Sequence, residues 1–97
     1  MTRFDLSREA AADLNGIVDF TVERWGKNQA RAYVDALQAR LTELAHHARL
    51  GRTRDELAEG LLSFPFESHV IFYQHAAFGI AVVRILYKRQ DALMYFE

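Results

Sequence analysis

The sequence predicts an α+β fold in which a helical hairpin packs against one face of a sheet of about four strands. Three observations predict it. Residues 3–7 alternate between apolar and polar side chains, and the next two segments carry apolar residues spaced three and four apart. In the second half, residues 68–74 and 80–87 are rich in β-branched and aromatic residues. The predicted order is strand, helix, helix, strand, strand, strand.

The composition narrows the class of protein. A chain of 97 residues predicts one small domain, residues 1–97, and its 51% hydrophobic residues suffice for a core. The sequence holds no cysteine, which removes disulfides, thiolate metal sites and thiol nucleophiles. A formal net charge of −1 excludes a globally basic nucleic-acid binder but leaves room for a local basic patch.

The first helix is predicted at about residues 8–24, after a short strand that buries Phe4 and Leu6. Ser7 is the predicted N-cap, because its hydroxyl can accept a hydrogen bond from a free N–H group of the first turn. Gly26 is the predicted C-terminal cap. The apolar stripe consists of Leu14, Ile17, Val18, Thr21, Val22 and Trp25.

The second helix is predicted to begin at Asn28 as its N-cap, so that residues 25–27 link two antiparallel helices. Its apolar stripe consists of Ala30, Tyr33, Val34, Leu37, Leu41, Leu44, Ala45 and Ala48. Both stripes must pack on something else. We expect the most buried side chains to include Leu14, Ile17, Val18, Leu37, Leu41 and Leu44.

The second half predicts the rest of the sheet and a tail. Residues 52–56 are polar and charged, residues 57–63 are a weak strand candidate, and residues 75–79 are a predicted turn. Residues 80–87 form the strongest predicted strand. In residues 91–97, Asp91 is expected to cap a short helical turn that leaves Met94, Tyr95 and Phe96 exposed as contact surface.

Motifs for cofactor or nucleophile chemistry are missing from the sequence. The histidines have no metal-ligand spacing, Gly-x-Ser-x-Gly is absent, and so are phosphate-binding glycine loops. We therefore expect no catalytic residue, no metal and no cofactor. The charged N-terminus and the lack of an apolar run of about 20 residues predict a soluble, cytoplasmic protein that has no membrane partner.

Basic residues are the most informative polar feature. Arg52 and Arg54 lie in one segment, and Arg84, Lys88 and Arg89 lie in another. If the segments meet, they form a positive patch for nucleic acid or for an acidic protein segment; otherwise they are solvated or salt-bridged charges. Arg84 interrupts an apolar strand, so it must pair with a carboxylate or point into a site.

Together these segments resemble ParE toxins of the RelE/ParE superfamily. The resemblance is carried by residues 6–14 (LSREAAADL), residues 24–26 (RWG), residues 69–73 (HVIFY) and residues 83–91 (VRILYKRQD). It runs nearly from end to end of the chain and preserves the order and spacing of these pieces.

The resemblance implies a mostly antiparallel, four-stranded sheet and a toxin that does not catalyse a reaction. It also implies a ParD-like antitoxin, whose C-terminal segment wraps the toxin, and DNA gyrase as the target. The toxin would then contact nucleic acid only indirectly, through the antitoxin or the gyrase complex. The expected antitoxin- or target-binding residues are Arg52, Arg54, Arg84, Tyr87, Lys88, Arg89, Met94, Tyr95 and Phe96.

Two departures from ParE sequences bear on activity. Tyr87 stands where a histidine is common, and a tyrosine could donate a proton. Leu61 and Leu62 follow Gly60, where an arginine is common, which makes nuclease chemistry less favourable. A ribosome-dependent mRNA endonuclease of the RelE type therefore remains the alternative. A binding module that is no longer toxic is a third interpretation.

Overall fold

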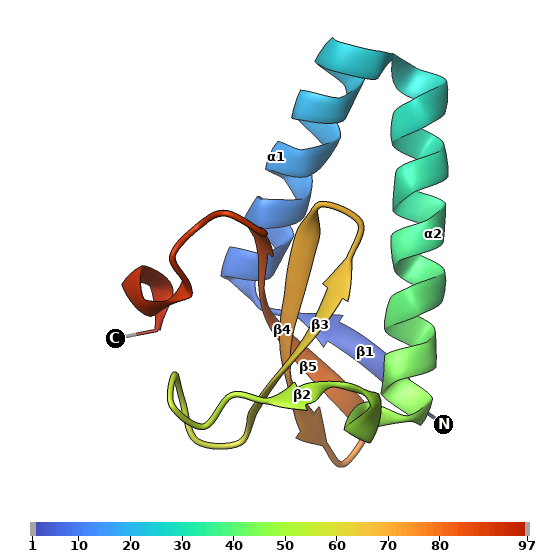
Figure 1. Cartoon of the computed structure of the whole chain (residues 1–97). Helices are drawn as coiled ribbons and strands as arrows, with labels where there is room; N and C mark the ends of the chain where they lie inside the picture. The colour runs from blue at the N-terminus through green and yellow to red at the C-terminus, as the bar shows by residue number, and fades with distance from the viewer. Residues whose placement is uncertain (1, 97) are drawn as a thin grey trace.

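The computed structural model describes residues 2–96 and confirms the α+β class (Figure 1). Glu97, the last residue of the predicted tail, lies outside the described residues. The elements are β1 (Arg3–Leu6), α1 (Arg8–Trp25), α2 (Lys27–His46), the 3-10 helix η1 (Ala48–Leu50), β2 (Arg52–Thr53), β3 (Leu61–Phe66), β4 (His69–Ala76), β5 (Gly79–Tyr87) and the 3-10 helix η2 (Ala92–Tyr95).

The described residues form a five-stranded sheet in the order β1-β5-β4-β3-β2. β1 runs parallel to β5, and the other neighbours are antiparallel. The expectation of about four strands was one too few, because Arg52 and Thr53 pair with Ser63 and Leu62 as an edge strand. The strand predicted at residues 57–63 begins only at Leu61, since residues 55–60 form turns.

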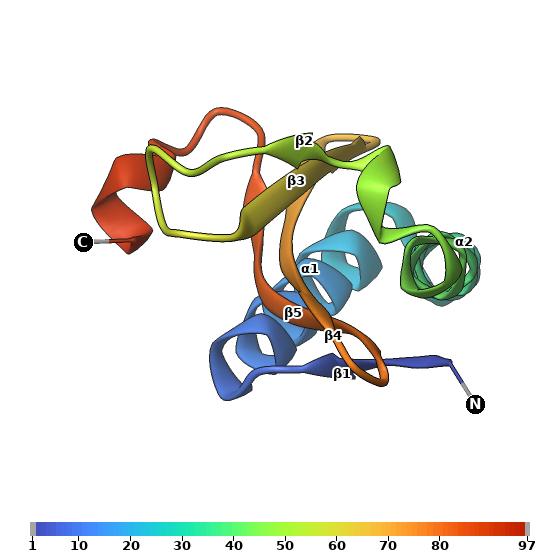
Figure 2. The same ribbon diagram turned by 90° about the horizontal axis from the view of Figure 1, so that it is seen from below.

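Both helices lie on one side of the sheet, and the core lies between the layers (Figure 2). Of the side chains expected to be most buried, Ile17, Leu37, Leu41 and Leu44 are buried, whereas Leu14 and Val18 are half-buried. Trp25 was wrongly assigned to the buried stripe, since 69% of it is exposed. It is the last residue of α1, at the end of the hairpin that projects beyond the strands (Figure 1).

The caps explain where the helices begin and end. Ser7 Oγ accepts a hydrogen bond from the Ala10 N–H at 2.9 Å, as predicted. Gly26 ends α1 with a φ of 92°, a conformation that glycine adopts without strain, and its N–H donates to the Val22 carbonyl. The second helix begins directly at Lys27. Asn28 was therefore wrongly predicted as an N-cap, and the linker is one residue instead of three.

A β-bulge in β5 decides which way Arg84 points. Phe72 pairs with Arg84 and Tyr73 pairs with Val82, so that Val83 is the additional residue. Ile80 and Val82 lie in the helix-side core before the bulge, and Ile85 lies there after it. Without the bulge, the alternation would place residue 84 in that core. The bulge therefore keeps a charged side chain out of the main core.

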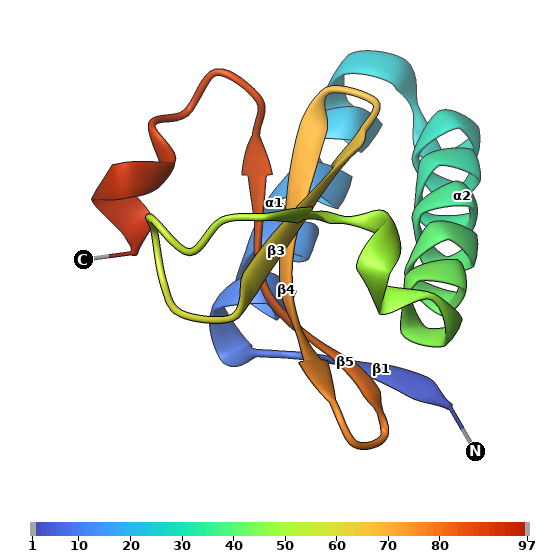
Figure 3. The ribbon, with the colours of Figure 1, turned by 60° about the horizontal axis from the view of Figure 1, so that its bottom comes forward.

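The opposite face of the sheet has an apolar cluster of its own. Leu57, Leu61, Phe72 and Leu86 are buried there, and Phe96 packs against them. The loop after β2 and the C-terminal tail (residues 88–96) both lie on the side of the molecule away from α2 (Figure 3). Neither helix is apolar enough over its length to cross a membrane, and no other helix among residues 2–96 is either.

Candidate functional site

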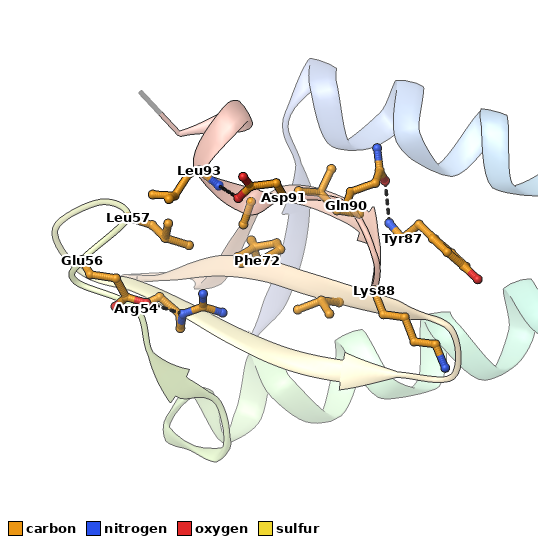
Figure 4. Close-up of a pocket in the computed structure, with 12 residues that line it drawn as sticks. Arg54, Glu56, Leu57, Phe72, Tyr87, Lys88, Gln90, Asp91 and Leu93 are labelled. Carbon is orange, nitrogen blue, oxygen red and sulfur yellow. Dashed lines mark hydrogen bonds and ion pairs between the residues drawn. The ribbon is translucent and has the colours of Figure 1, made fainter.

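A groove of about 370 Å³ opens between the loop after β2 and the C-terminal tail (Figure 4). We call it the outer groove. Its lining residues are Arg54, Glu56, Leu57, Val70, Phe72, Leu86, Tyr87, Lys88, Gln90, Asp91, Ala92 and Leu93. Each of the two basic segments of the sequence contributes one lining residue, namely Arg54 and Lys88.

The floor of the outer groove is apolar. Phe72 of β4 and Leu86 of β5 are nearly completely buried, and Val70 pairs with Leu86 across the two strands. The ring of Phe96 packs on Phe72 with 5.0 Å between the ring centroids. Such a floor accepts apolar side chains of a partner, since their burial removes apolar surface from water.

The rim of the outer groove carries both signs of charge. Arg54 Nε donates to a Glu56 carboxylate oxygen at 2.7 Å, and this hydrogen bond lowers the pKa of Glu56. Asp91 caps η2 by accepting the Leu93 N–H at 3.0 Å, as predicted. Lys88 forms no ion pair among residues 2–96. The rim therefore offers one cation already held in an exposed pair and one without a counter-ion.

Arg84 lies beside the outer groove and is engaged on two sides. Its Nε and Nη2 atoms each donate to Asp13 of α1 at 2.8 Å, and Asp13 also accepts the Ile85 N–H at 2.9 Å. The hydrogen bonds to Asp13 raise the pKa of Arg84. The guanidinium carbon lies 4.7 Å from the ring centroid of Tyr95. Of the two alternatives predicted for Arg84, the structure places it in a carboxylate pair.

The predicted binding residues are only partly brought together. Arg54, Tyr87 and Lys88 line the outer groove, whereas Tyr95 and Phe96 flank it by packing on Arg84 and Phe72. The expectation that Phe96 is exposed was wrong, because its ring packs half-buried on the outer apolar cluster. The remaining residues are exposed and do not line the groove, namely Arg52 of β2, Arg89 of the turn after β5, and Met94, which is 76% exposed.

Besides Glu56 and the apolar lining of the groove, sequence reasoning missed two polar residues that orient the site. Asp13 follows the buried Ala10 by three positions and precedes the buried Ile17 by four, so helical spacing places it on the packed face. An acid at such a position, together with one arginine inside an apolar strand, was a usable signal for the pair. Gln90 accepts the Tyr87 N–H and donates to the Tyr95 hydroxyl, both at 2.7 Å, and had no signal in the sequence.

A second cavity, the helix cleft, has about 730 Å³ between α1, the start of α2 and the turn before β4. The exposed rings of Phe20 and Trp25 border it, and Tyr33 and His69 line it. Burial raises the pKa of Tyr33 to about 12 and lowers the pKa of His69. Elsewhere, His46, His47 and His75 are among the residues that line an open cavity of about 1290 Å³, and no metal-binding group is formed within residues 2–96.

Comparisons with known proteins identify the family. The family model described as "ParE toxin of type II toxin-antitoxin system, parDE" matches residues 4–92. Toxin ParE1 of Mycobacterium tuberculosis is 40% identical over 91 residues, which cover 93% of each chain. Toxin ParE of Escherichia coli is 34% identical over 94 residues, which cover 96% of this chain and 91% of that protein.

Toxin ParE1 of Caulobacter vibrioides is 34% identical over 92 residues, which cover 95% of each chain. A solved structure described as "Chromosomal ParDE TA system from P. aeruginosa" superposes with a TM-score of 0.74 at 25% identity. That match covers 90% of this chain and 96% of the other. By sequence and by fold, the chain belongs to the ParE toxin family of type II toxin–antitoxin systems.

Proposed function

We propose that this ParE toxin stops growth by binding DNA gyrase, and that a ParD-like antitoxin neutralises it. In this proposal the toxin acts by occupying a surface of gyrase and does not catalyse a reaction. Family membership and the resemblance of the sequence support gyrase as the target. The ion pair between Arg84 and Asp13 is the observation that supports a toxin without catalytic activity.

Cleavage of RNA requires a cation that is available to the charge that develops on the phosphate. The Nε and Nη2 atoms of Arg84 both donate to Asp13, and the ring of Tyr95 lies against the guanidinium. Leu61, at the position where ParE sequences often have an arginine, is buried in the apolar cluster of the outer face. These contacts favour a binding surface over a nuclease centre.

The outer groove is the proposed seat of the antitoxin. Its apolar floor lies below Arg54 and Lys88, so it fits a segment that carries both apolar and acidic side chains. An acidic side chain of the antitoxin would compete with Glu56 for Arg54 and would give Lys88 a partner. We expect this segment to be amphipathic and to order on binding.

The C-terminal tail is the proposed gyrase-contacting element. Met94 is exposed, and Tyr95, which is partly exposed, presents aromatic surface of the kind that contributes most to interface energy, whereas Phe96 anchors the tail on Phe72. The tail forms one wall of the outer groove. An antitoxin segment in the groove would therefore lie beside the tail and block access of gyrase to it.

The proposal is tested by inducing the chain in cells without the antitoxin, with co-induction of the antitoxin as the control. Filamentation with activation of a DNA-damage reporter is expected for gyrase inhibition. Arrested translation with cleaved mRNA would support the RelE-type endonuclease, for which Tyr87 in the groove would be the proton donor. A chain that produces no phenotype would be a binding module without toxicity.

A further inference from the structure

We infer that Asp13 of α1 is a positioning residue for the C-terminal tail and acts on it through Arg84. The inference rests on the proposed function, in which the tail contacts the target. Asp13 lies 71 positions before Arg84 in the chain and, through this contact, determines the orientation of the tail.

Asp13 fixes the plane of the Arg84 guanidinium. The two oxygens of Asp13 receive two parallel N–H bonds from Arg84, a geometry that permits one orientation of the planar group. The Ile85 N–H bond holds the carboxylate against the backbone of β5 at the same time. The side chains of Asp13 and Arg84 are only 14% and 20% exposed, so water competes weakly for these bonds.

The fixed guanidinium is in turn a platform for the tail. Tyr95 lies over it at 4.7 Å, and the Tyr95 hydroxyl accepts a hydrogen bond from Gln90. Gln90 is itself tied to β5, because its side-chain oxygen accepts the Tyr87 N–H. The arrangement is a closed chain of contacts from α1 through β5 to η2.

Few other contacts orient η2. Leu93 and Met94 are exposed, and η2 itself contains no buried residue. Phe96 packs on Phe72 at the far end of the tail, and Asp91 caps the near end. Ala92 and Phe96 pack on the outer apolar cluster, so the platform below Tyr95 is the contact that orients the exposed middle of the tail, and its loss loosens that part.

The substitution Asp13→Asn tests this chain of contacts. The asparagine amide keeps an acceptor for the Ile85 N–H but brings no charge to the guanidinium, which then loses its ion-pair partner at a partly buried position. We expect Arg84 to turn toward water and Tyr95 to lose its platform. The matched control is Asp19→Asn, which removes a carboxylate at an exposed position of the same helix.

The readout is amide hydrogen exchange of the full chain, together with growth arrest and antitoxin affinity. Relative to D19N, we expect D13N to accelerate exchange at Leu93 and Met94 by at least about tenfold more than it accelerates exchange in β4. A role confined to general stability would accelerate exchange in β4 and the tail together. We expect growth arrest to weaken in D13N and to persist in D19N.

Arg84→Lys gives an independent test if D13N is too unstable. Lysine keeps the charge opposite Asp13 but loses the planar group under Tyr95, so tail exchange should again rise. Unchanged tail exchange in R84K, or equal tail exchange in D13N and D19N, would overturn the inference. Where deletion of the tail abolishes toxicity, faster tail exchange in D13N with full toxicity would also overturn it, because orientation would then have no functional role.

Deletion of residues 94–97 separates this inference from the proposed function. A folded deletion variant that binds antitoxin but is not toxic supports the tail as the target contact. If that variant stays fully toxic, the proposed role of the tail fails, whereas the exchange data for D13N still decide whether Asp13 orients it.

Discussion

The Tyr33 hydroxyl lies 2.7 Å from Nδ1 of His69 and joins the helical hairpin to the sheet through this contact. Tyr33 belongs to α2 and His69 begins β4, so the pair bridges two layers. The ring of Tyr33 also meets Phe66 edge to face, and the ring of His69 meets Tyr87 in the same way. The pair is therefore part of an aromatic wall of the helix cleft.

This pair predicts a pH dependence of folding stability. Burial lowers the pKa of His69 below its ordinary value of 6.5, and the nearby charge of Asp13 opposes that effect without cancelling it. The folded state then binds fewer protons than the unfolded state. The stability that depends on neutral His69 is present above pH 6.5 and is lost as the pH falls through the lowered value.

The test is urea unfolding of the wild type and of His69→Gln between pH 7.5 and 5. We expect the wild type to lose more free energy of unfolding than H69Q as the pH falls over that range, because only the wild type has the imidazole. H69Q keeps every carboxylate of the wild type, so the difference between the two proteins reports on the imidazole. A difference that stays constant with pH would show that His69 does not make this contribution.

A pair of glycine substitutions should change stability in opposite directions. A Cβ atom at Gly51 would clash with the hydroxyl oxygen of the buried Tyr73, whose O–H donates to the Ala48 carbonyl at 2.6 Å. We expect Gly51→Ala to lower the free energy of unfolding by about 1–3 kcal/mol through overpacking.

Gly16→Ala is the matched control, because a Cβ atom there meets nothing within 4 Å on the surface of α1. We expect it to raise the free energy of unfolding by about 0.5–1 kcal/mol, since alanine loses less conformational entropy in a helix. Chemical denaturation of both variants tests the pair. Equal effects of the two substitutions would contradict the packing around Tyr73.

Charge reversal at the rim of the outer groove should weaken antitoxin binding. We expect Arg54→Glu and Lys88→Glu each to lower antitoxin affinity by about tenfold or more at low salt, and by less at high salt. Arg31→Glu is the control, at an exposed position of α2 outside the groove. Titration at two salt concentrations measures the effect. Unchanged antitoxin affinity in both groove variants would show that the antitoxin does not bind in the outer groove.

The helices and the long strands were predictable because their patterns are local. The stripes on α1 and α2 and the apolar run of β5 each follow from the spacing of a few neighbouring residues. The two-residue strand β2 was not predictable, because Arg52 and Thr53 have no apolar alternation and become a strand only by pairing with β3. Trp25 and Asn28 were misassigned because the helix ends depend on Gly26 and on where the sheet stops.

The candidate site depends on contacts between distant parts of the sequence. The sequence posed the alternatives for Arg84, but Asp13 resolves them from 71 positions away, after a bulge has turned the side chain. The outer groove exists because the tail folds back over β4 and β5, where Phe96 meets Phe72. Local patterns predicted Arg54 and Lys88 as binding residues but could not predict that both line one groove.

Titration of the full chain into a gyrase supercoiling reaction tests the central claim most directly. If the toxin acts by occupying gyrase, inhibition should grow with the ratio of toxin to gyrase, stay constant with incubation time, and be reversed by added antitoxin. Absence of inhibition at a large excess of toxin would contradict gyrase as the target. Inhibition that progresses with time at far less than one toxin per gyrase would contradict a mechanism without turnover.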